Sequence, residues 1–133
     1  MKEWRPLAEQ GNVKAHYNLG EMYHNGKGVL QDYKTAVKWY TLSAEQGIAI
    51  AQYDLGVMYE NGNGVLQDYV KTHMWYNICS SIASNSHNNF SYRHLALVCR
   101  GDKDNLAKET TPYQIEKAQD LARECVAKNY KGC

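Results

Sequence analysis

Residues 8–43 read AEQGNVKAHYNLGEMYHNGKGVLQDYKTAVKWYTLS, and residues 44–79 read AEQGIAIAQYDLGVMYENGNGVLQDYVKTHMWYNIC. The second stretch follows the first at an offset of 36 positions without a gap, and 20 of the 36 positions are identical. A period of this size is typical of stacked supersecondary units, each of which buries its apolar face against the next one. The sequence therefore predicts a repeat protein.

Each repeat contains two segments with the spacing of an amphipathic helix. Apolar residues of the first segment recur at i, i+4, i+7 and i+8, and they are Ala15, Leu19, Met22 and Tyr23, then Ala51, Leu55, Met58 and Tyr59. The second segment begins after Asp32 or Asp68, which suit a helix N-cap, and in the first repeat it stops at Gly47. Glycines in residues 25–28 and 61–64 can adopt the positive φ of a chain reversal. Each repeat is therefore predicted to be a helix, a turn and an antiparallel helix.

Gly20 and Gly56 lie inside the first helix of their repeats. Glycine costs on the order of 1 kcal/mol relative to alanine in a helix interior. We therefore expect a packing reason, namely that the partner helix approaches closely where there is no side chain.

These features resemble the Sel-one-like repeat family, close relatives of the tetratricopeptide repeats, in its bacterial form. The resemblance is carried by the Leu-Gly pairs at 19–20 and 55–56, the Gly-x-Gly-Val turns at 26–29 and 62–65, Asp32, Asp68, Ala36, the Trp-Tyr pairs at 39–40 and 75–76, and Ala-Glu-Gln-Gly at both repeat starts. It implies an all-α fold, a right-handed superhelical solenoid. It also implies a non-catalytic adaptor that binds a protein or an extended peptide on the concave face of the stacked helices.

We expect a single solenoid domain over residues 1–133. Its parts are residues 1–7 as the end of a preceding repeat, 8–43 and 44–79 as repeats, 80–110 as a degenerate repeat, and 111–133 as a C-terminal capping helix and tail. The degenerate repeat lacks the family's glycines, and Gly101-Asp102 is expected to divide it into two helical pieces. Thr111-Pro112-Tyr113-Gln114 predicts a capping box that opens the last helix.

The predicted peptide-binding residues lie on the first helices, outside the core stripe. They are Tyr17, Asn18, Glu21, Asn25, Tyr53, Asp54, Val57 and Asn61. In this hypothesis Asn18 and Asp54 hydrogen-bond the backbone of the bound segment, while Tyr17 and Tyr53 pack on its side chains. A solvated helix face with aromatic packing remains the alternative.

Four cysteines are present, and the family resemblance favours a disulfide between Cys125 and Cys133. The chain has to turn back near residues 129–132, because a continuous helix would hold the two Cα atoms about 12 Å apart. We expect Cys79 and Cys99 to be buried small apolar residues. A disulfide would indicate an oxidising compartment, periplasmic or extracellular. The chain shows no signal peptide, and a cytoplasmic location stays open as the alternative.

The charge balance gives no support to nucleic acid as a partner. Fifteen Lys and Arg residues face fourteen Asp and Glu residues, a formal net charge of +1, and no basic run interleaves with aromatic residues. Apolar stretches are far shorter than the roughly 18 residues of a membrane span. The missing first helix before Trp4 and Leu7 leaves an apolar edge on which a homodimer is an alternative.

No catalytic or metal motif stands out, so we predict neither enzymatic activity nor a cofactor. Serine β-lactamases use Ser-x-x-Lys, and here lysine never follows serine by three residues. The histidines are His16, His24, His73, His87 and His94, and they form no His-Glu-x-x-His pair for zinc. Cys99 near His94 lacks an orienting acid. Cysteine-rich relatives have been linked to β-lactam hydrolysis, so a weak hydrolase of β-lactams or cell-wall amides is the remaining alternative.

Overall fold

The computed structural model describes residues 13–84 and 90–133, and these form six α-helices. The helices are α2 (Val13–Asn25), α3 (Tyr33–Ala44), α4 (Ala49–Asn61), α5 (Tyr69–Ser84), α6 (Phe90–Ala107) and α7 (Pro112–Ala127). The described part of the chain contains no strand, so the fold is an all-α helical repeat solenoid. The expectations for residues 1–7 and for His87 fall outside the described residues.

Local sequence signals determine where these helices begin and turn. Asp32 is the N-cap of α3, where its side chain accepts a hydrogen bond from the Thr35 amide at 3.2 Å. Asp68 accepts from the Lys71 amide at 3.1 Å in the second repeat. The glycines of both turns have positive φ, from 69° to 76°. The predicted helix-turn-helix unit is thereby confirmed in both copies.

The two helical glycines allow a tyrosine ring to lie against the helix backbone. A Cβ atom on Gly20 would lie 2.5 Å from the ring of Tyr40, and one on Gly56 would lie 2.7 Å from the ring of Tyr76. Both tyrosines are on the second helix of the same repeat and are almost completely buried. The close helix approach predicted from these glycines is confirmed.

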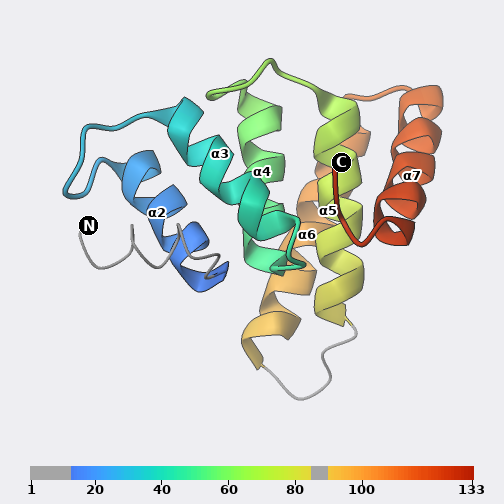
Figure 1. The fold of residues 1–133 in the computed structure, drawn as a ribbon. Helices are drawn as coiled ribbons and strands as arrows, with labels where there is room; N and C mark the ends of the chain where they lie inside the picture. Colours follow the sequence, from blue (N-terminus) through green and yellow to red (C-terminus); the bar gives the residue numbers. More distant parts are fainter. Residues whose placement is uncertain (1–12, 85–89) are drawn as a thin grey trace.

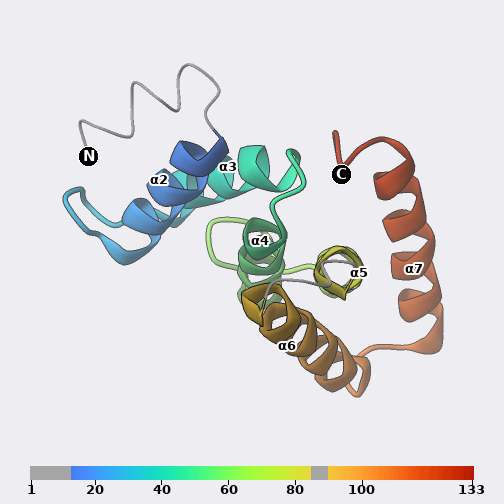
Figure 2. The same cartoon turned by 90° about the horizontal axis from the view of Figure 1, so that it is seen from below.

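The helices α2 to α5 lie side by side in chain order, α6 packs on α5, and α7 packs mainly on the other side of α5 (Figures 1 and 2). The main core is therefore built between consecutive helices and includes Ala36, Tyr40, Leu55, Met58, Trp75 and Ile78. Met58, which the sequence places on the apolar stripe, is 1% exposed and belongs to this core.

The course of helix α6 differs from the prediction. The sequence led us to expect a break at Gly101-Asp102, but α6 continues through both residues to Ala107. A Cβ on Gly101 would meet nothing within 4 Å. Packing of α6 along α5 supplies the stabilisation that the glycine lacks, so tertiary contacts overrule its weak helix propensity.

The cysteines form two bridges, and one of them corrects a prediction. Cys125 is bonded to Cys133, the pair that the family resemblance favoured, with their Cα atoms 5.6 Å apart. Cys79 and Cys99 are buried, as expected, but they are also bonded to each other, so the prediction that they serve as buried apolar residues and not as a second bridge is wrong. Antiparallel packing of α5 on α6 brings their Cα atoms to 6.2 Å, within bridging distance.

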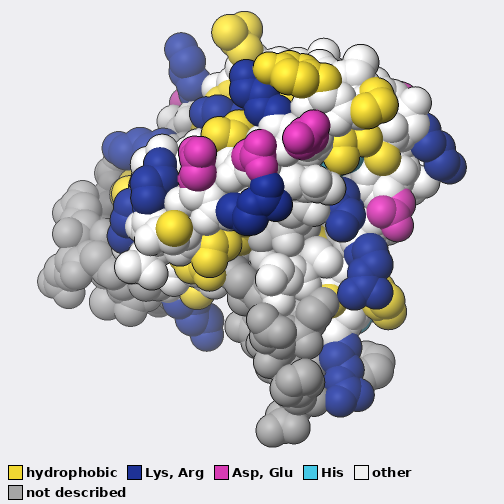
Figure 3. Space-filling model, turned by 90° about the vertical axis from the view of Figure 1, so that its right-hand side faces the viewer, with side chains coloured by type: hydrophobic (Ala, Val, Ile, Leu, Met, Phe, Trp, Pro, Cys, Tyr) yellow, Lys and Arg dark blue, Asp and Glu magenta, His cyan; other side chains and the backbone are white. Residues whose placement is uncertain are grey.

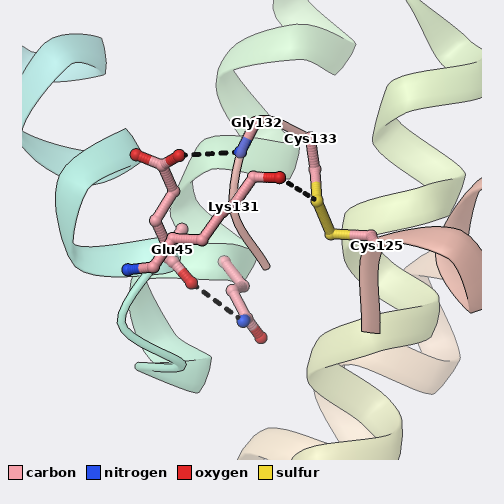
Figure 4. Close-up of a disulfide and its surroundings, with 7 residues drawn as sticks. Glu45, Cys125, Lys131, Gly132 and Cys133 are labelled. Atoms are coloured by element: carbon pink, nitrogen blue, oxygen red, sulfur yellow. Dashed lines mark hydrogen bonds between the residues drawn. A yellow bond between two sulfur atoms is a disulfide. The ribbon is translucent and has the colours of Figure 1, made fainter. Parts of the chain in front are cut away.

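The C-terminal tail folds back from α7 to the turn between the two repeats (Figure 4). The Gly132 amide donates a hydrogen bond to Glu45 Oε2 at 2.9 Å. The ring of Tyr130 lies against Gly47, where an added Cβ would be 3.2 Å from the ring. Because Cys133 is bonded to Cys125, the tail is held at both ends.

Candidate functional site

The described residues enclose a hollow of about 300 Å³ between the first helices of the two repeats, which we call the α2–α4 groove. Its lining consists of Glu21, His24 and Asn25 from α2, Tyr40 from α3, and Tyr53, Asp54, Val57 and Met58 from α4. This volume lies at the lower end of the range of small-ligand sites, roughly 300–1,000 Å³. The groove therefore suits a side chain or a short segment of a partner.

Asp54 is the central acid of the groove. Its Oδ2 accepts a hydrogen bond from the Tyr17 hydroxyl at 2.9 Å, which links α2 to α4. Burial, with a smaller contribution from the nearby Glu21 side chain, raises the pKa of Asp54 to about 7, although the hydrogen bond from Tyr17 acts in the opposite direction. Near neutral pH, both the protonated and the ionised form of Asp54 are therefore populated, and a cation in the groove would favour the ionised form.

The second acid of the groove, Glu21, is held in place by a tyrosine hydroxyl. The Tyr40 hydroxyl donates a hydrogen bond to Glu21 Oε1 at 2.5 Å, and the rings of Tyr17 and Tyr40 lie 5.9 Å apart. Burial, followed by the neighbouring carboxylates, raises the pKa of both tyrosines. Both hydroxyls therefore remain protonated and act as donors to the acids.

A second hollow of about 210 Å³, the α4–α6 groove, is lined by Glu60 together with Asp102, Asn105, Leu106 and Glu109. Tyr53 connects it to the first groove, because its ring lines the first and its hydroxyl donates to Asp102 Oδ2 at 2.7 Å. Tyr76 donates to Glu60 at 2.9 Å and stacks on Tyr53, with their ring centroids 5.6 Å apart. The tyrosine–carboxylate arrangement is thus repeated along the molecule.

The structure brings most of the predicted binding residues together. Glu21, Asn25, Tyr53, Asp54 and Val57 line the α2–α4 groove. The lining does not include Tyr17, Asn18 or Asn61, although Tyr17 contacts the groove through its bond to Asp54.

Three lining residues, His24, Tyr40 and Met58, are not among the predicted binding residues. Tyr40 and Met58 lie on the core stripe, and side chains of that stripe can still form the floor of a groove between helices. His24 occupies the position that Glu60 occupies in the next repeat. A polar residue at the same position of both repeats was the signal that could have pointed to His24.

The described segments contain neither a cluster of metal ligands nor a free cysteine thiol. Within residues 13–84 and 90–133, no group of three or more His, Cys, Asp or Glu residues is arranged to hold a metal ion. Cys99 is bonded to Cys79 and has no free thiol that could act as a nucleophile. Among the helices described, none is both long enough and apolar enough to cross a membrane.

The model of the Sel1 repeat matches residues 13–48 and 49–78, and these are the two helix pairs that form the α2–α4 groove. The chain is a Sel1-repeat protein. Repeats of this family generally serve as scaffolds for protein interactions and generally are not catalytic. The structure places the groove at the junction of the two matched repeats.

Two solved structures are similar to this Sel1-repeat protein. One is a protective antigen of uropathogenic Escherichia coli strains that displays an SLR fold, with a TM-score of 0.79 and 29% identity over 96% of this chain. The other is a Sel1 repeat protein from Oxalobacter formigenes, with a TM-score of 0.59 and 34% identity over 62% of this chain. The chain spans 26% and 34% of their lengths, respectively. No curated protein matches the chain.

Proposed function

We propose that this Sel1-repeat protein is a non-catalytic adaptor that binds a protein or an extended peptide on the face formed by α2, α4 and α6. The observation that carries the proposal is the α2–α4 groove, which residues of two consecutive repeats build together. The hydrogen bond between Tyr17 and Asp54 joins the two first helices across it. A surface shared between repeats is how solenoid proteins bind extended partners.

Within this proposal, Asp54 contacts the backbone or a side chain of the bound segment and Tyr53 packs on it. Asn18 lies next to the groove and is partly exposed, so it extends the contact along α2. Two buried or half-buried disulfide pairs suit an oxidising compartment, and we propose that the protein works in the periplasm or outside the cell.

A display selection from a library of random peptides tests the proposal. Peptides selected on the chain are measured against the double variant Asn18→Ala/Asp54→Ala. The matched control is Asp104→Ala/Gln119→Ala, which removes a carboxylate and an amide from exposed positions on α6 and α7. We expect the first variant to lose binding and the control to retain it. Peptides that bind both variants equally, or a selection that yields no binder, would contradict the proposal.

Sedimentation of the chain alone accompanies this experiment. A mass that rises with concentration, together with no selected peptide, would favour a self-associating structural module instead. The two outcomes are distinct because the selection measures peptide binding and sedimentation measures self-association.

A further inference from the structure

The two grooves share one chemical character. Of the described residues that line them, five are carboxylates and none is lysine or arginine. The carboxylates are Glu21 and Asp54 in the α2–α4 groove, and Glu60, Asp102 and Glu109 in the α4–α6 groove. Two tyrosine rings, Tyr40 and Tyr53, form part of the wall of the first groove.

The negative charge of the grooves is local. The whole chain has a formal net charge of +1, so its overall charge does not attract cations. The side of the molecule that carries α7 shows Lys and Arg intermingled with Asp and Glu (Figure 3). The grooves are therefore lined by carboxylates without lysine or arginine, whereas the α7 side carries both signs of charge, and this difference determines which partner the grooves suit.

We propose that the bound segment is a basic one, and that the α2–α4 groove receives a lysine or arginine side chain of an extended peptide. The proposal rests on the proposed function and names the chemistry of its partner. Carboxylates form charge-assisted hydrogen bonds with ammonium and guanidinium groups, and tyrosine rings attract the same cations through their faces. A bound cation also offsets the repulsion between two neighbouring carboxylates, and Glu21 and Asp54 are close enough to interact in this way.

The position of Tyr53 extends this site along the molecule. Its ring lines the first groove and its hydroxyl is bonded to Asp102 in the second, so the two hollows adjoin. A segment that leaves the α2–α4 groove along this face next meets the carboxylates of the α4–α6 groove. A second basic side chain of the same peptide has its binding site there.

The test uses three ten-residue peptides built from Gly, Ser and Tyr, each with a neutral fluorophore. One carries two arginines, one carries citrulline in their place as a neutral isostere, and one carries glutamate. Binding is measured by fluorescence anisotropy at low and at physiological salt. The variant Glu21→Gln/Asp54→Asn is compared with Asp104→Asn/Glu116→Gln, which removes two carboxylate charges from exposed positions of α6 and α7.

We expect the arginine peptide to bind the original chain about tenfold more tightly than the citrulline peptide, the size of one or two charged hydrogen bonds. The groove variant is expected to lose this preference, and the control variant to keep it. Equal binding of the arginine and citrulline peptides, absence of binding, or an equal loss in both variants would overturn the inference. Circular dichroism checks that the variants are folded. If the groove variant is unfolded, the inference is tested by comparing the arginine and citrulline peptides on the original chain.

The failure of this inference is distinguishable from failure of the proposed function. Displayed peptides that depend on Asn18 and Asp54 but lack basic residues would overturn the basic-segment inference and leave the adaptor function supported. A selection without any groove-dependent peptide would overturn both.

Discussion

The protonation state of Asp54 depends on neighbouring side chains from several helices. Tyr17 and Glu21 on α2, Tyr40 on α3 and Tyr53 on its own helix face it, and burial together with Glu21 raises its pKa. The Asp54 carboxyl group is therefore partly protonated and partly ionised near neutral pH. At the residue scale this makes both the stability of the fold and the charge of the groove dependent on pH.

The pH dependence of stability should change when Asp54 is replaced. Its pKa is about 7 in the folded chain against 3.8 for the ordinary group, so the folded state holds the proton more tightly. Its contribution to stability is complete below pH 3.8 and is lost as the pH rises through 7, a loss on the order of 1–2 kcal/mol. Urea unfolding at pH 5 and pH 8 should show this loss in the original chain and a smaller one in Asp54→Asn.

The matched control for that measurement is Asp104→Asn, an exposed acid of α6. It should keep the pH dependence of the original chain. Identical profiles for Asp54→Asn and the original chain would show that Asp54 titrates in its ordinary range.

The helical glycines allow a paired prediction. Gly56→Ala places a Cβ 2.7 Å from the ring of Tyr76, which is packed in the core, so we expect unfolding free energy to fall by about 1–3 kcal/mol. Gly101→Ala meets no atom within 4 Å and should raise it by up to about 1 kcal/mol. Chemical denaturation of both variants measures this, and an equal effect of the two substitutions would contradict the packing explanation.

At the scale of elements, the C-terminal tail joins two parts of the chain that are distant in sequence. The bridge from Cys125 to Cys133 turns the tail back, so that Gly132 reaches Glu45 and Tyr130 reaches Gly47. Asn129 and Tyr130 both have positive φ, 54° and 67°, which costs free energy for residues with a Cβ. The bridge and the contacts at the repeat junction offset this cost.

Cys133→Ser should release the tail. Closing the short loop between Cys125 and Cys133 stabilises the fold by about 2 kcal/mol in the chain-entropy model, and we expect the variant to lose about that amount. Hydrogen exchange at the Gly132 amide should become fast, because its bond to Glu45 depends on the turn. Lys131→Ser, which keeps the bridge, is the control; slow exchange at Gly132 in Cys133→Ser would show that the tail holds its position without the disulfide.

At the scale of the whole molecule, stability is shared between neighbouring helices. Each helix contacts mainly those next to it in the stack. Links between residues distant in the chain include the hydrogen bond from Tyr53 to Asp102, the two disulfides and the tail. Repeat proteins of this kind gain stability from nearest-neighbour interfaces and can open locally. The two bridges lie in the half of the molecule formed by α5, α6 and α7.

Reduction should therefore loosen one half of the molecule first. With both disulfides reduced, we expect hydrogen exchange to accelerate in α6 and α7, while α2, α3 and α4 keep most of their protection. Mass spectrometry of peptic fragments with and without reductant measures this. A uniform loss of protection would show instead that the solenoid unfolds as one cooperative unit.

The sequence by itself determined the repeat, the helix pairs and most of the groove. Identical residues at an offset of 36, helical spacing, Asp32 as a cap and the capping box at Thr111 are local signals, and each acts within one or two turns of chain. Gly20 and Gly56 even indicated a close approach of helices. Five of the predicted binding residues line the α2–α4 groove because they share helix faces that the repeat makes equivalent.

Only the tertiary structure decided the rest. The bond between Cys79 and Cys99 depends on how α6 packs along α5, and four cysteines allow three pairings that sequence alone does not separate. The continuity of α6 through Gly101, the return of the tail to Glu45, and the place of Tyr40 in the groove wall are also contacts between elements. Local sequence encodes where helices begin and end, but such contacts depend on the packing of segments distant in the chain, which periodicity does not specify.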